Sequence, residues 1–249
     1  HRGFETVTIV YSGEVAHRDS AGNGGVIGPG DVQWMTAASG ILHEEFHSPE
    51  FTRRGGMLEM AQLWVNLPAR HKMSAPRYQT IESARIPDVA LPDGAGRVRV
   101  IGGKHGVAIG PAETFTDMNV WDVRLNGGRA ASLRVPDGHN TVIAVLRGAI
   151  TVNGSRRAGP AELLVLDRAG DELHIAAEAA VDAATPGGGP GEGAVLLVLS
   201  GEPIAEPIVG HGPFVMNTRA EIDTALKDFR TGQFGRMAPA RDAAHRSGI

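Results

Sequence analysis

Residues 6–17, TVTIVYSGEVAH, have the pattern of two short β-strands separated by a turn. The first part, TVTIVY, consists of β-branched residues and one tyrosine, which are residue types that strands favour. Ser12-Gly13 interrupts it, Glu14 to His17 resumes an extended pattern, and a cluster of turn residues runs from Asp19 to Gly25. The stretch therefore predicts a β-hairpin.

The same rhythm of short strands and turns continues along the chain. Its 34 glycines exceed the average share of roughly 7%, and together with 15 prolines they predict many turns. This pattern favours an all-β sandwich or barrel over alternating strand and helix units. Further strands are predicted at 32–36, 60–67, 97–101, 119–125, 141–146, 149–152, 162–166 and 194–199.

The predicted strands fall into two groups, which indicates two β domains. Residues 68–90 are richer in Pro, Arg and Ser, as in a crossover between domains. We expect an N-terminal domain at 1–82, a C-terminal domain at 83–218, and a helix with a tail at 219–249.

Two segments stand apart from the strand pattern. Residues 219–230 place Ile222, Leu226 and Phe229 at helical spacing after the candidate caps Asn217-Thr218, which predicts one helix. The glycine-rich residues 186–193 lack the Lys-Ser/Thr and the spaced glycines of nucleotide-binding loops. We expect a hairpin tip there.

The composition narrows the class of protein and the kind of partner. A hydrophobic share of 42% supports a globular chain with one large or two modest cores. The net charge is −4, and acidic and basic residues are interspersed along the sequence. This charge pattern gives no positive patch for direct nucleic-acid binding. No apolar run approaches the roughly 20 residues that span a bilayer, so no membrane segment is expected. The absence of cysteine fits a reducing compartment such as the cytoplasm, and it restricts metal ligands to histidine and carboxylate.

Metal-competent side chains gather in two of the predicted strands. Alternate residues of a strand face the same side, so His43, Glu45 and His47 share one face, and His1 and Glu5 share another. If the two strands face each other across a barrel, these side chains converge. Imidazole and carboxylate together suit Fe, Mn, Ni, Cu, Co or Zn. We therefore predict that His1, His43 and Glu45 are ligands of one mononuclear metal ion.

Residues 43–47, HEEFH, also satisfy the H-E-x-x-H signature of zinc proteases. That signature acts only on a helix, where residues i and i+4 lie on one face. Gly40 precedes the segment and Ser48-Pro49 follow it at once, which leaves no room for a helix of about 10 residues. A strand is the favoured interpretation, and a protease is disfavoured.

Three long runs resemble the pirin family of the cupin superfamily. They are HRGFETVTIVYSGEVAHRDSAGNGGVIGPGDVQWMTAASGILHEE at 1–45, AQLWVNLPARHKMSAPRYQ at 61–79 and GEPIAEPIVGHGPFVMNT at 201–218. The resemblance implies two cupin (double-stranded β-helix, or jelly-roll) barrels, the first with a mononuclear iron site and the second free of metal. In that family an H-x-H pair and an H-x-E pair hold the iron. His1 matches the second histidine of the first pair, and His43 and Glu45 match the second pair.

The first histidine of that H-x-H pair would lie two residues before His1. We therefore expect that an N-terminal piece of the natural protein precedes this sequence, and that these 249 residues alone bind metal weakly or not at all. His47 and Glu5 are interpreted as a rim residue and a pocket-wall residue, rather than as the fourth ligand.

The resemblance also implies an activity. Pirins resemble quercetin 2,3-dioxygenases, in which a flavonol binds the metal through its 3-hydroxyl and O2 opens the heterocycle with release of carbon monoxide. We expect Fe(II) as cofactor, a small aromatic substrate such as a flavonol, and Glu45 as catalytic base. The alternative is a non-enzymatic, iron-dependent redox-sensing binding protein or transcriptional co-regulator with a protein partner. The predicted substrate-pocket residues are Phe4, Glu5, Trp34, Met35 and His47.

Overall fold

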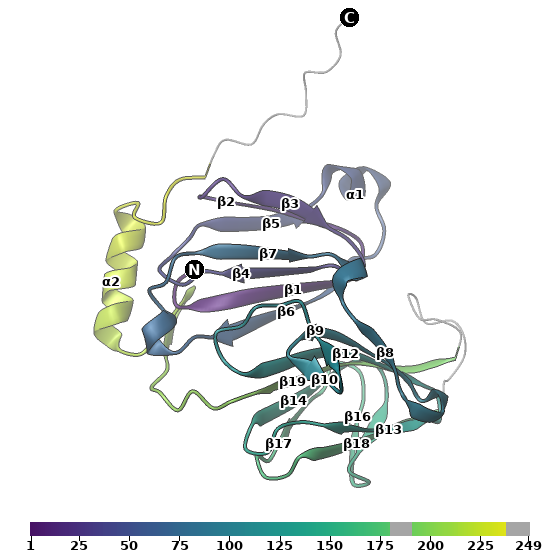
Figure 1. The fold of residues 1–249 in the computed structure, drawn as a ribbon. Coiled ribbons are helices and arrows are strands. Elements are labelled where there is room, and N and C mark those ends of the chain that lie inside the picture. Colours follow the sequence, from purple (N-terminus) through teal and green to yellow (C-terminus); the bar gives the residue numbers. More distant parts are fainter. Residues whose placement is uncertain (180–190, 238–249) are drawn as a thin grey trace, which may run out of the picture. The chain divides into compact units, whose positions relative to one another are not determined.

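The computed structural model describes residues 1–179 and 191–237 of the chain, apart from the side chain of residue 192 (Figure 1). The described part consists mainly of β-strands and contains two α-helices, α1 (Pro49–Arg54) and α2 (Arg219–Arg230). The all-β prediction and the helix predicted at 219–230 are confirmed. Neither helix is long and apolar enough to cross a membrane. Residues 186–190 of the glycine-rich stretch lie outside the described residues.

Contacts within the chain divide it into two compact units. The first contains His1–Pro29, Gln33–Tyr78 and the segment from Glu206 onward, and the second contains Gly30–Val32 and Gln79–Ala205. This division assigns residues 206–218 to the first unit, whereas the sequence suggested the second domain. The reason is local pairing: the N–H of Val215 donates to the carbonyl oxygen of Arg2 at 3.0 Å.

Two main sheets build the first unit. A four-stranded sheet has the order β6-β1-β4-β7, a three-stranded sheet has the order β3-β2-β5, and β20 and β21 form a ribbon. Their bounds are β1 (Phe4–Ser12), β2 (Val15–Asp19), β3 (Gly24–Ile27), β4 (Val32–Thr36), β5 (His43–His47), β6 (Glu59–Asn66), β7 (Arg77–Ile81), β20 (Val209–His211) and β21 (Phe214–Met216), with a 3-10 turn η1 (Ala69–His71).

The hairpin predicted for residues 6–17 does not form, although both of its strands do. β1 pairs with β6, and β2 pairs with β3 and β5, so the two strands lie in different sheets. β2 makes its hairpin with β3 instead. In that turn, the Asp19 carboxylate accepts hydrogen bonds from the backbone N–H groups of Ala21 and Asn23, both at 2.8 Å. An aspartate that satisfies the turn's own backbone donors stabilises this hairpin.

The second unit also contains two main sheets. A six-stranded sheet has the order β17-β14-β19-β12-β9-β8, a four-stranded sheet has the order β13-β18-β15-β16, and β10 and β11 form a ribbon. The bounds are η2 (Ser83–Arg85), β8 (Asp88–Ala90), η3 (Pro92–Gly94), β9 (Gly96–Gly102), β10 (Lys104–His105), β11 (Ala108–Ile109), β12 (Met118–Asn126), β13 (Ala130–Arg134), β14 (Asn140–Gly148), β15 (Ile150–Val152), β16 (Arg156–Ala158), β17 (Leu163–Leu166), β18 (Glu172–Ala177) and β19 (Glu192–Gly201).

Each unit has an apolar core that also contains polar side chains. In the second unit, apolar side chains from both main sheets, such as Val123 and Ile175, pack into one large core, which lies beside buried polar residues such as Asp122. The first unit buries apolar residues such as Val10 together with the polar residues His17 and Asp19. Buried polar groups require partners or a function. In the first unit, these buried polar residues lie on strand β2, next to the predicted ligand strand β5.

Candidate metal centre

Two paired strands of the first unit carry four metal-competent side chains on one face. β2 and β5 pair antiparallel, with His17 opposite Glu45 and Asp19 opposite His43. Directly opposed residues share a face of the sheet, so these four side chains gather together. Because HEEFH forms strand β5, the zinc-protease interpretation is excluded. His17 and Asp19 were not predicted as site residues, although their alternation at 17 and 19 matches that at 43 and 45.

His1 joins this face from the start of the chain. Its ring centroid lies 4.8 Å from that of His43, 5.0 Å from that of Phe4 and 5.3 Å from that of Trp64. The structure thus brings together the predicted ligands His1 and His43.

The prediction that His1 and Glu5 share a strand face is wrong. Strand alternation breaks at Gly3, which has a positive φ of 89°, so His1 lies on the side of Phe4. Glu5 points to the opposite face, where it is fully buried and accepts a hydrogen bond from the Thr36 hydroxyl at 2.6 Å. Burial raises the pKa of Glu5.

Side chains of β1 and β6 hold the Glu45 carboxylate. The Thr8 hydroxyl donates to Oε1 of Glu45 at 2.9 Å, and Nε2 of Gln62 donates to Oε2 at 2.6 Å. The same Nε2 also lies 3.0 Å from Oγ1 of Thr8, closing a triangle of polar groups. Thr8 and Gln62 were not predicted as site residues. Gln62 stands in the run AQLWVNLP, where a polar residue among apolar ones is the signal that was available.

Tyr78 packs against His17 at the same face. The rings of His17 and Tyr78 stack at 5.4 Å with an interplanar angle of 18°, and the Tyr78 hydroxyl donates to Sδ of Met35 at 3.0 Å. Burial, reinforced by Asp19 and Glu45, raises the pKa of Tyr78, which therefore stays protonated. Tyr78 was also missed by sequence reasoning, because it lies in the predicted crossover.

Burial favours the neutral form of His43 and of His17. The pKa of His43 falls to about 4 because of burial, the positive chain terminus and His17, with Asp19 opposing. Burial lowers the pKa of His17 as well. Nδ1 of each ring is buried and has no hydrogen-bond partner within the described part of the chain. A neutral imidazole nitrogen without a partner is the form that binds metal.

The side chains at this site are of the types that bind metal ions. Two neighbouring imidazoles, an unpartnered Nδ1 and a carboxylate on the same face form a nitrogen and oxygen donor set. However, Thr8 and Gln62 donate hydrogen bonds to the two oxygens of Glu45. The described residues also contain no group of three or more His, Cys, Asp or Glu side chains arranged to hold an ion. Binding therefore requires Glu45 to turn away from one of these donors.

The predicted pocket residues separate into three locations. Phe4 packs against Trp64, with ring centroids 4.4 Å apart, and Met35 contacts Tyr78, so both lie at the site. Trp34 follows the opposite alternation on β4 and does not share the face of Met35. His47 lies at the far end of β5, exposed and packed edge-on against Phe51.

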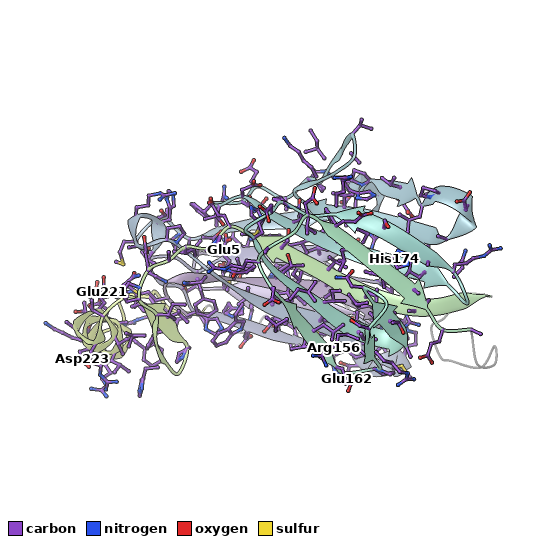
Figure 2. The ribbon with its side chains drawn as sticks, turned by 90° about the horizontal axis from the view of Figure 1, so that it is seen from below. Glu5, Arg156, Glu162, His174, Glu221 and Asp223 are labelled. Carbon is purple, nitrogen blue, oxygen red and sulfur yellow. The ribbon has the colours of Figure 1, made fainter. Side chains whose placement is uncertain are left out.

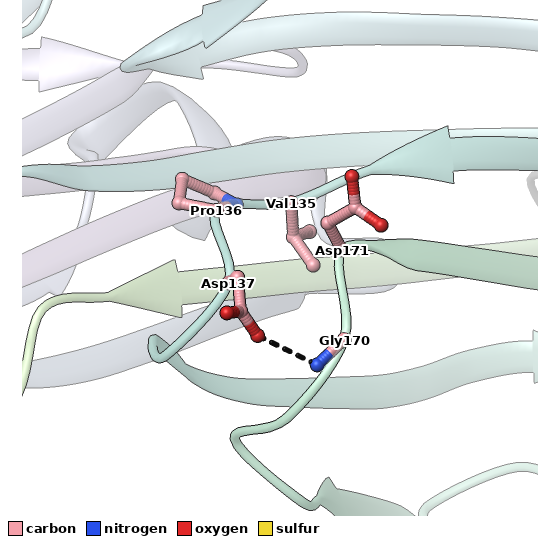
Figure 3. A pocket seen from close by; sticks show the side chains of 5 residues that line it. All are labelled: Val135, Pro136, Asp137, Gly170 and Asp171. Carbon is pink, nitrogen blue, oxygen red and sulfur yellow. Dashed lines mark hydrogen bonds between the residues drawn. The ribbon is translucent and has the colours of Figure 1, made fainter.

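A separate pocket of about 600 Å³ lies in the second unit (Figure 3). Asp137 and Asp171 both line it, but the Asp137 carboxylate accepts from the N–H of Gly170 at 2.7 Å and Asp171 pairs with Arg134 at 2.8 Å. Both carboxylates thus have partners within the protein, and no histidine lines this pocket. The expected absence of metal from the second domain stays a prediction.

Two family models match the chain. One described as Pirin matches residues 1–65, and one described as Pirin C-terminal cupin domain matches residues 120–235. A Pseudomonas aeruginosa protein named "Putative quercetin 2,3-dioxygenase PA2418" is 55% identical over 234 residues, covering 94% of this chain and 77% of its own length. A "Pirin-like protein" from Caulobacter vibrioides is 41% identical over 236 residues, covering 94% of this chain and 78% of its own.

Solved structures agree with these matches. A quercetin 2,3-dioxygenase from Acinetobacter baumannii shares 50% identity and a TM-score of 0.87, covering 96% of this chain and 78% of its own. The Escherichia coli pirin YhhW in complex with nickel(II) shares the fold, at 21% identity and a TM-score of 0.59, over 82% of this chain and 74% of its own.

The fold is that of a bicupin, a protein built from two cupin domains. The chain belongs to the pirin family. The resemblance seen in the sequence is thereby confirmed.

Proposed function

We propose that this chain contributes His1, His43 and Glu45 to a mononuclear metal site and that the protein catalyses a quercetin 2,3-dioxygenase-type reaction, in which O2 cleaves the heterocycle of a flavonol and carbon monoxide is released. The observation that carries the proposal is the neighbouring His1 and His43 rings with the Glu45 carboxylate on the same face. The names of similar proteins support the reaction class. Fe(II) is the proposed metal, since His and carboxylate ligands suit it, and Mn, Ni, Cu, Co and Zn are its competitors.

Each residue has a definable part in this proposal. The bound metal would supply a Lewis-acidic centre with open coordination positions. His1 and His43 would hold it through imidazole nitrogens, and Glu45 through a carboxylate oxygen. Oε2 of Glu45 would accept the proton of the flavonol 3-hydroxyl. Gln62, which already donates to that oxygen, keeps it directed toward the site.

The test compares aerobic and anaerobic turnover. Protein loaded with Fe(II), and separately with each competing metal, is mixed with quercetin, and flavonol absorbance and carbon monoxide are followed. We expect absorbance loss that requires O2 and yields one carbon monoxide per flavonol. Glu45→Gln should abolish turnover, whereas His174→Ala, at an exposed site on β18 of the second unit (Figure 2), should not. Metal-loaded protein without O2-dependent loss would contradict the enzyme and favour the redox-sensing binding protein.

A cytoplasmic location belongs to the same proposal. It is supported by the absence of cysteine from the sequence, which fits a reducing compartment.

A further inference from the structure

Trp64 is exposed to solvent, unlike the two other tryptophans of the chain. Its exposed fraction is 51%, whereas Trp34 and Trp121 are fully buried. Yet its ring is held in place: Phe4 lies 4.4 Å away at 32° and His1 lies 5.3 Å away at 70°. An indole that is packed on one side and open on the other presents a fixed aromatic surface beside a predicted metal ligand.

The exposed face extends along β6. Met60, Gln62 and Trp64 alternate on one side of this strand, and all three are exposed. Among the residues that the structure describes, β6 pairs only with β1, so it forms an edge of its sheet. The opposing β1 residues Val10, Thr8 and Thr6 are buried. The open strip on β6 therefore lies next to the buried polar groups of the metal centre.

The amide of Gln62 and the indole of Trp64 lie on the same side of β6, two residues apart. Gln62 lies two residues from Trp64 and donates to Oε2 of Glu45 at 2.6 Å. Two residues along a strand span about 6.7 Å, which suits one small ring system and its hydroxyl. A flat aromatic molecule stacked on Trp64 can thus direct a hydroxyl group to Gln62 and Glu45.

We propose that Trp64 and Gln62 determine substrate specificity: the indole stacks on the aromatic rings of a flavonol, and the Gln62 amide, with Glu45, recognises its 3-hydroxyl. This inference rests on the proposed function and adds two residues that recognise the substrate. A small molecule fits better than a protein segment, because Gln62 interrupts the apolar strip between Met60 and Trp64. A protein interface would need a far larger continuous area, of about 800 Å² per partner.

The first experiment measures binding without turnover. Quercetin is titrated into nickel(II)-loaded protein under anaerobic conditions, and tryptophan fluorescence reports the contact. We expect quercetin to quench the emission of Trp64 in the wild type. Because the Trp64 variants lack this reporter, calorimetric titration compares the affinities, and we expect Trp64→Ala to bind about tenfold more weakly, since an aromatic pair contributes about 0.5–1.5 kcal/mol. Trp64→Phe, which keeps a ring, should lose less than about threefold. Trp121→Phe, in the core of the second unit, is the matched control and should bind as the wild type does.

The second experiment tests whether Gln62 recognises the 3-hydroxyl group of the flavonol. Luteolin is quercetin without the 3-hydroxyl, so the ratio of the two dissociation constants isolates that group. We expect wild-type protein to prefer quercetin, and Gln62→Leu to reduce this preference severalfold while luteolin binding stays the same. An unchanged preference would overturn the role of Gln62.

The outcomes separate this inference from the proposed function. If Trp64→Ala binds quercetin as tightly as wild type, or turns it over with unchanged KM, the role of Trp64 is wrong while the dioxygenase stands. If quercetin binds on Trp64 but is not consumed in air by Fe(II)-loaded protein, the dioxygenase fails and the recognition site stands. If wild-type protein binds no quercetin, both are overturned. Nickel(II) affinity is measured for each Trp64 variant, because Trp64 packs against His1, and quercetin binding is compared at full nickel(II) occupancy. Thermal unfolding should show that the variants are folded.

Discussion

The Nζ of Lys72 donates a hydrogen bond to the carbonyl oxygen of Val215 at 2.9 Å. It also donates to the carbonyl oxygen of Gly3 at 2.7 Å and to Oδ1 of Asn66 at 2.6 Å. Lys72 is fully buried, so it directs all three ammonium protons to protein acceptors. One side chain thereby joins the start of β1, the end of β6 and the late strand β21 within the first unit.

Lys72→Met should destabilise the protein. Three buried acceptors would lose their donor, and one such loss costs about 1–3 kcal/mol, so we expect the free energy of unfolding to fall by at least about 2 kcal/mol. Urea unfolding measures it. Lys104→Met, at an exposed position of the second unit, should change it by less than about 0.5 kcal/mol. Equal effects of the two variants would contradict the role of Lys72.

The same lysine should make stability depend on pH. Burial, opposed by Glu206 and Glu221, lowers the pKa of Lys72 from 10.5 to about 8 in the folded protein. Between these values the unfolded chain holds more protons at this group, so stability rises with pH. We expect the difference in unfolding free energy between wild type and Lys72→Met to be constant below pH 7 and to grow from pH 8 toward pH 10. A difference that stays flat over the whole range would rule out the shift.

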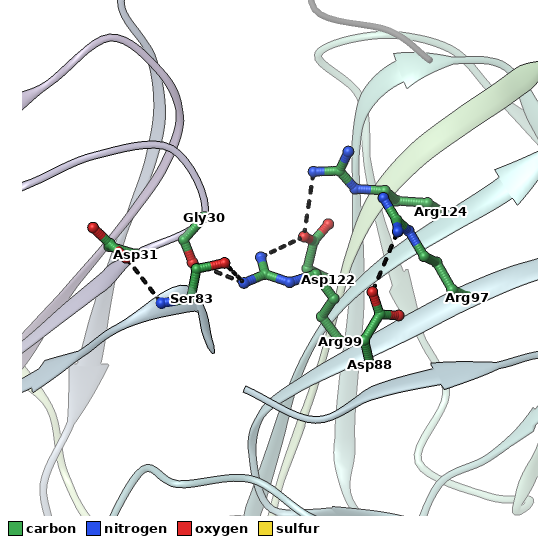
Figure 4. A network of polar contacts seen from close by, with 8 residues as sticks. All are labelled: Gly30, Asp31, Ser83, Asp88, Arg97, Arg99, Asp122 and Arg124. Atoms are coloured by element: carbon green, nitrogen blue, oxygen red, sulfur yellow. Dashed lines mark hydrogen bonds and ion pairs between the residues drawn. The ribbon is translucent and has the colours of Figure 1, made fainter. Parts of the chain in front are cut away.

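A buried ion pair should stabilise the second unit (Figure 4). Arg99 contacts Asp122 at 3.2 Å, with Asp122 fully buried and Arg99 nearly so, and also donates to the carbonyl oxygen of Gly30 at 2.8 Å. Asp122→Ala leaves the arginine buried without its counter-ion, which costs about 3–5 kcal/mol. The exposed pair of Arg97 and Asp88 is the control, and Asp88→Ala should cost less than about 1 kcal/mol. Chemical denaturation of the two variants gives both values.

Helix α2 should depend on its first residues. The Thr218 hydroxyl accepts from the N–H of Glu221, whose carboxylate accepts from the N–H of Thr218. Figure 2 shows Glu221 and Asp223 on this helix. Thr218→Ala removes half of this capping box and should lower stability by about 1 kcal/mol. Thr224→Ala, within the same helix, should be neutral or slightly stabilising. Thermal unfolding compares them, and a larger loss in Thr224→Ala would contradict the cap.

Removal of one imidazole should weaken metal binding. His43 presents a half-buried ring whose pKa is lowered and whose buried Nδ1 has no hydrogen-bond partner among the described residues. We expect His43→Ala to reduce nickel(II) or Fe(II) affinity by more than about 100-fold, beyond the 10- to 100-fold typical of supporting residues. Calorimetric titration measures it, with His174→Ala as control. His17→Ala tests the residue that the sequence did not predict, and an effect as large as that of His43→Ala would add His17 to the ligands.

Much of the site could be predicted from strand alternation alone. The spacing of His43 and Glu45 requires only that the segment be extended, and Gly40 and Ser48-Pro49 already excluded a long helix. The face shared by His43 and Glu45 was therefore predicted correctly. The same reasoning failed for His1 and Glu5, because the backbone at Gly3 adopts a positive φ that alternation does not anticipate.

The sequence by itself determined the family, the all-β architecture and the residue types available to a metal, since these depend on composition and local pattern. Only the tertiary structure decided which side chains meet. It placed His17 opposite Glu45 through the pairing of β2 with β5, and Gln62 and Trp64 beside them through the pairing of β6 with β1. The physical reason is that strand partners are chosen by long-range packing and turn geometry, which no local pattern of residues encodes.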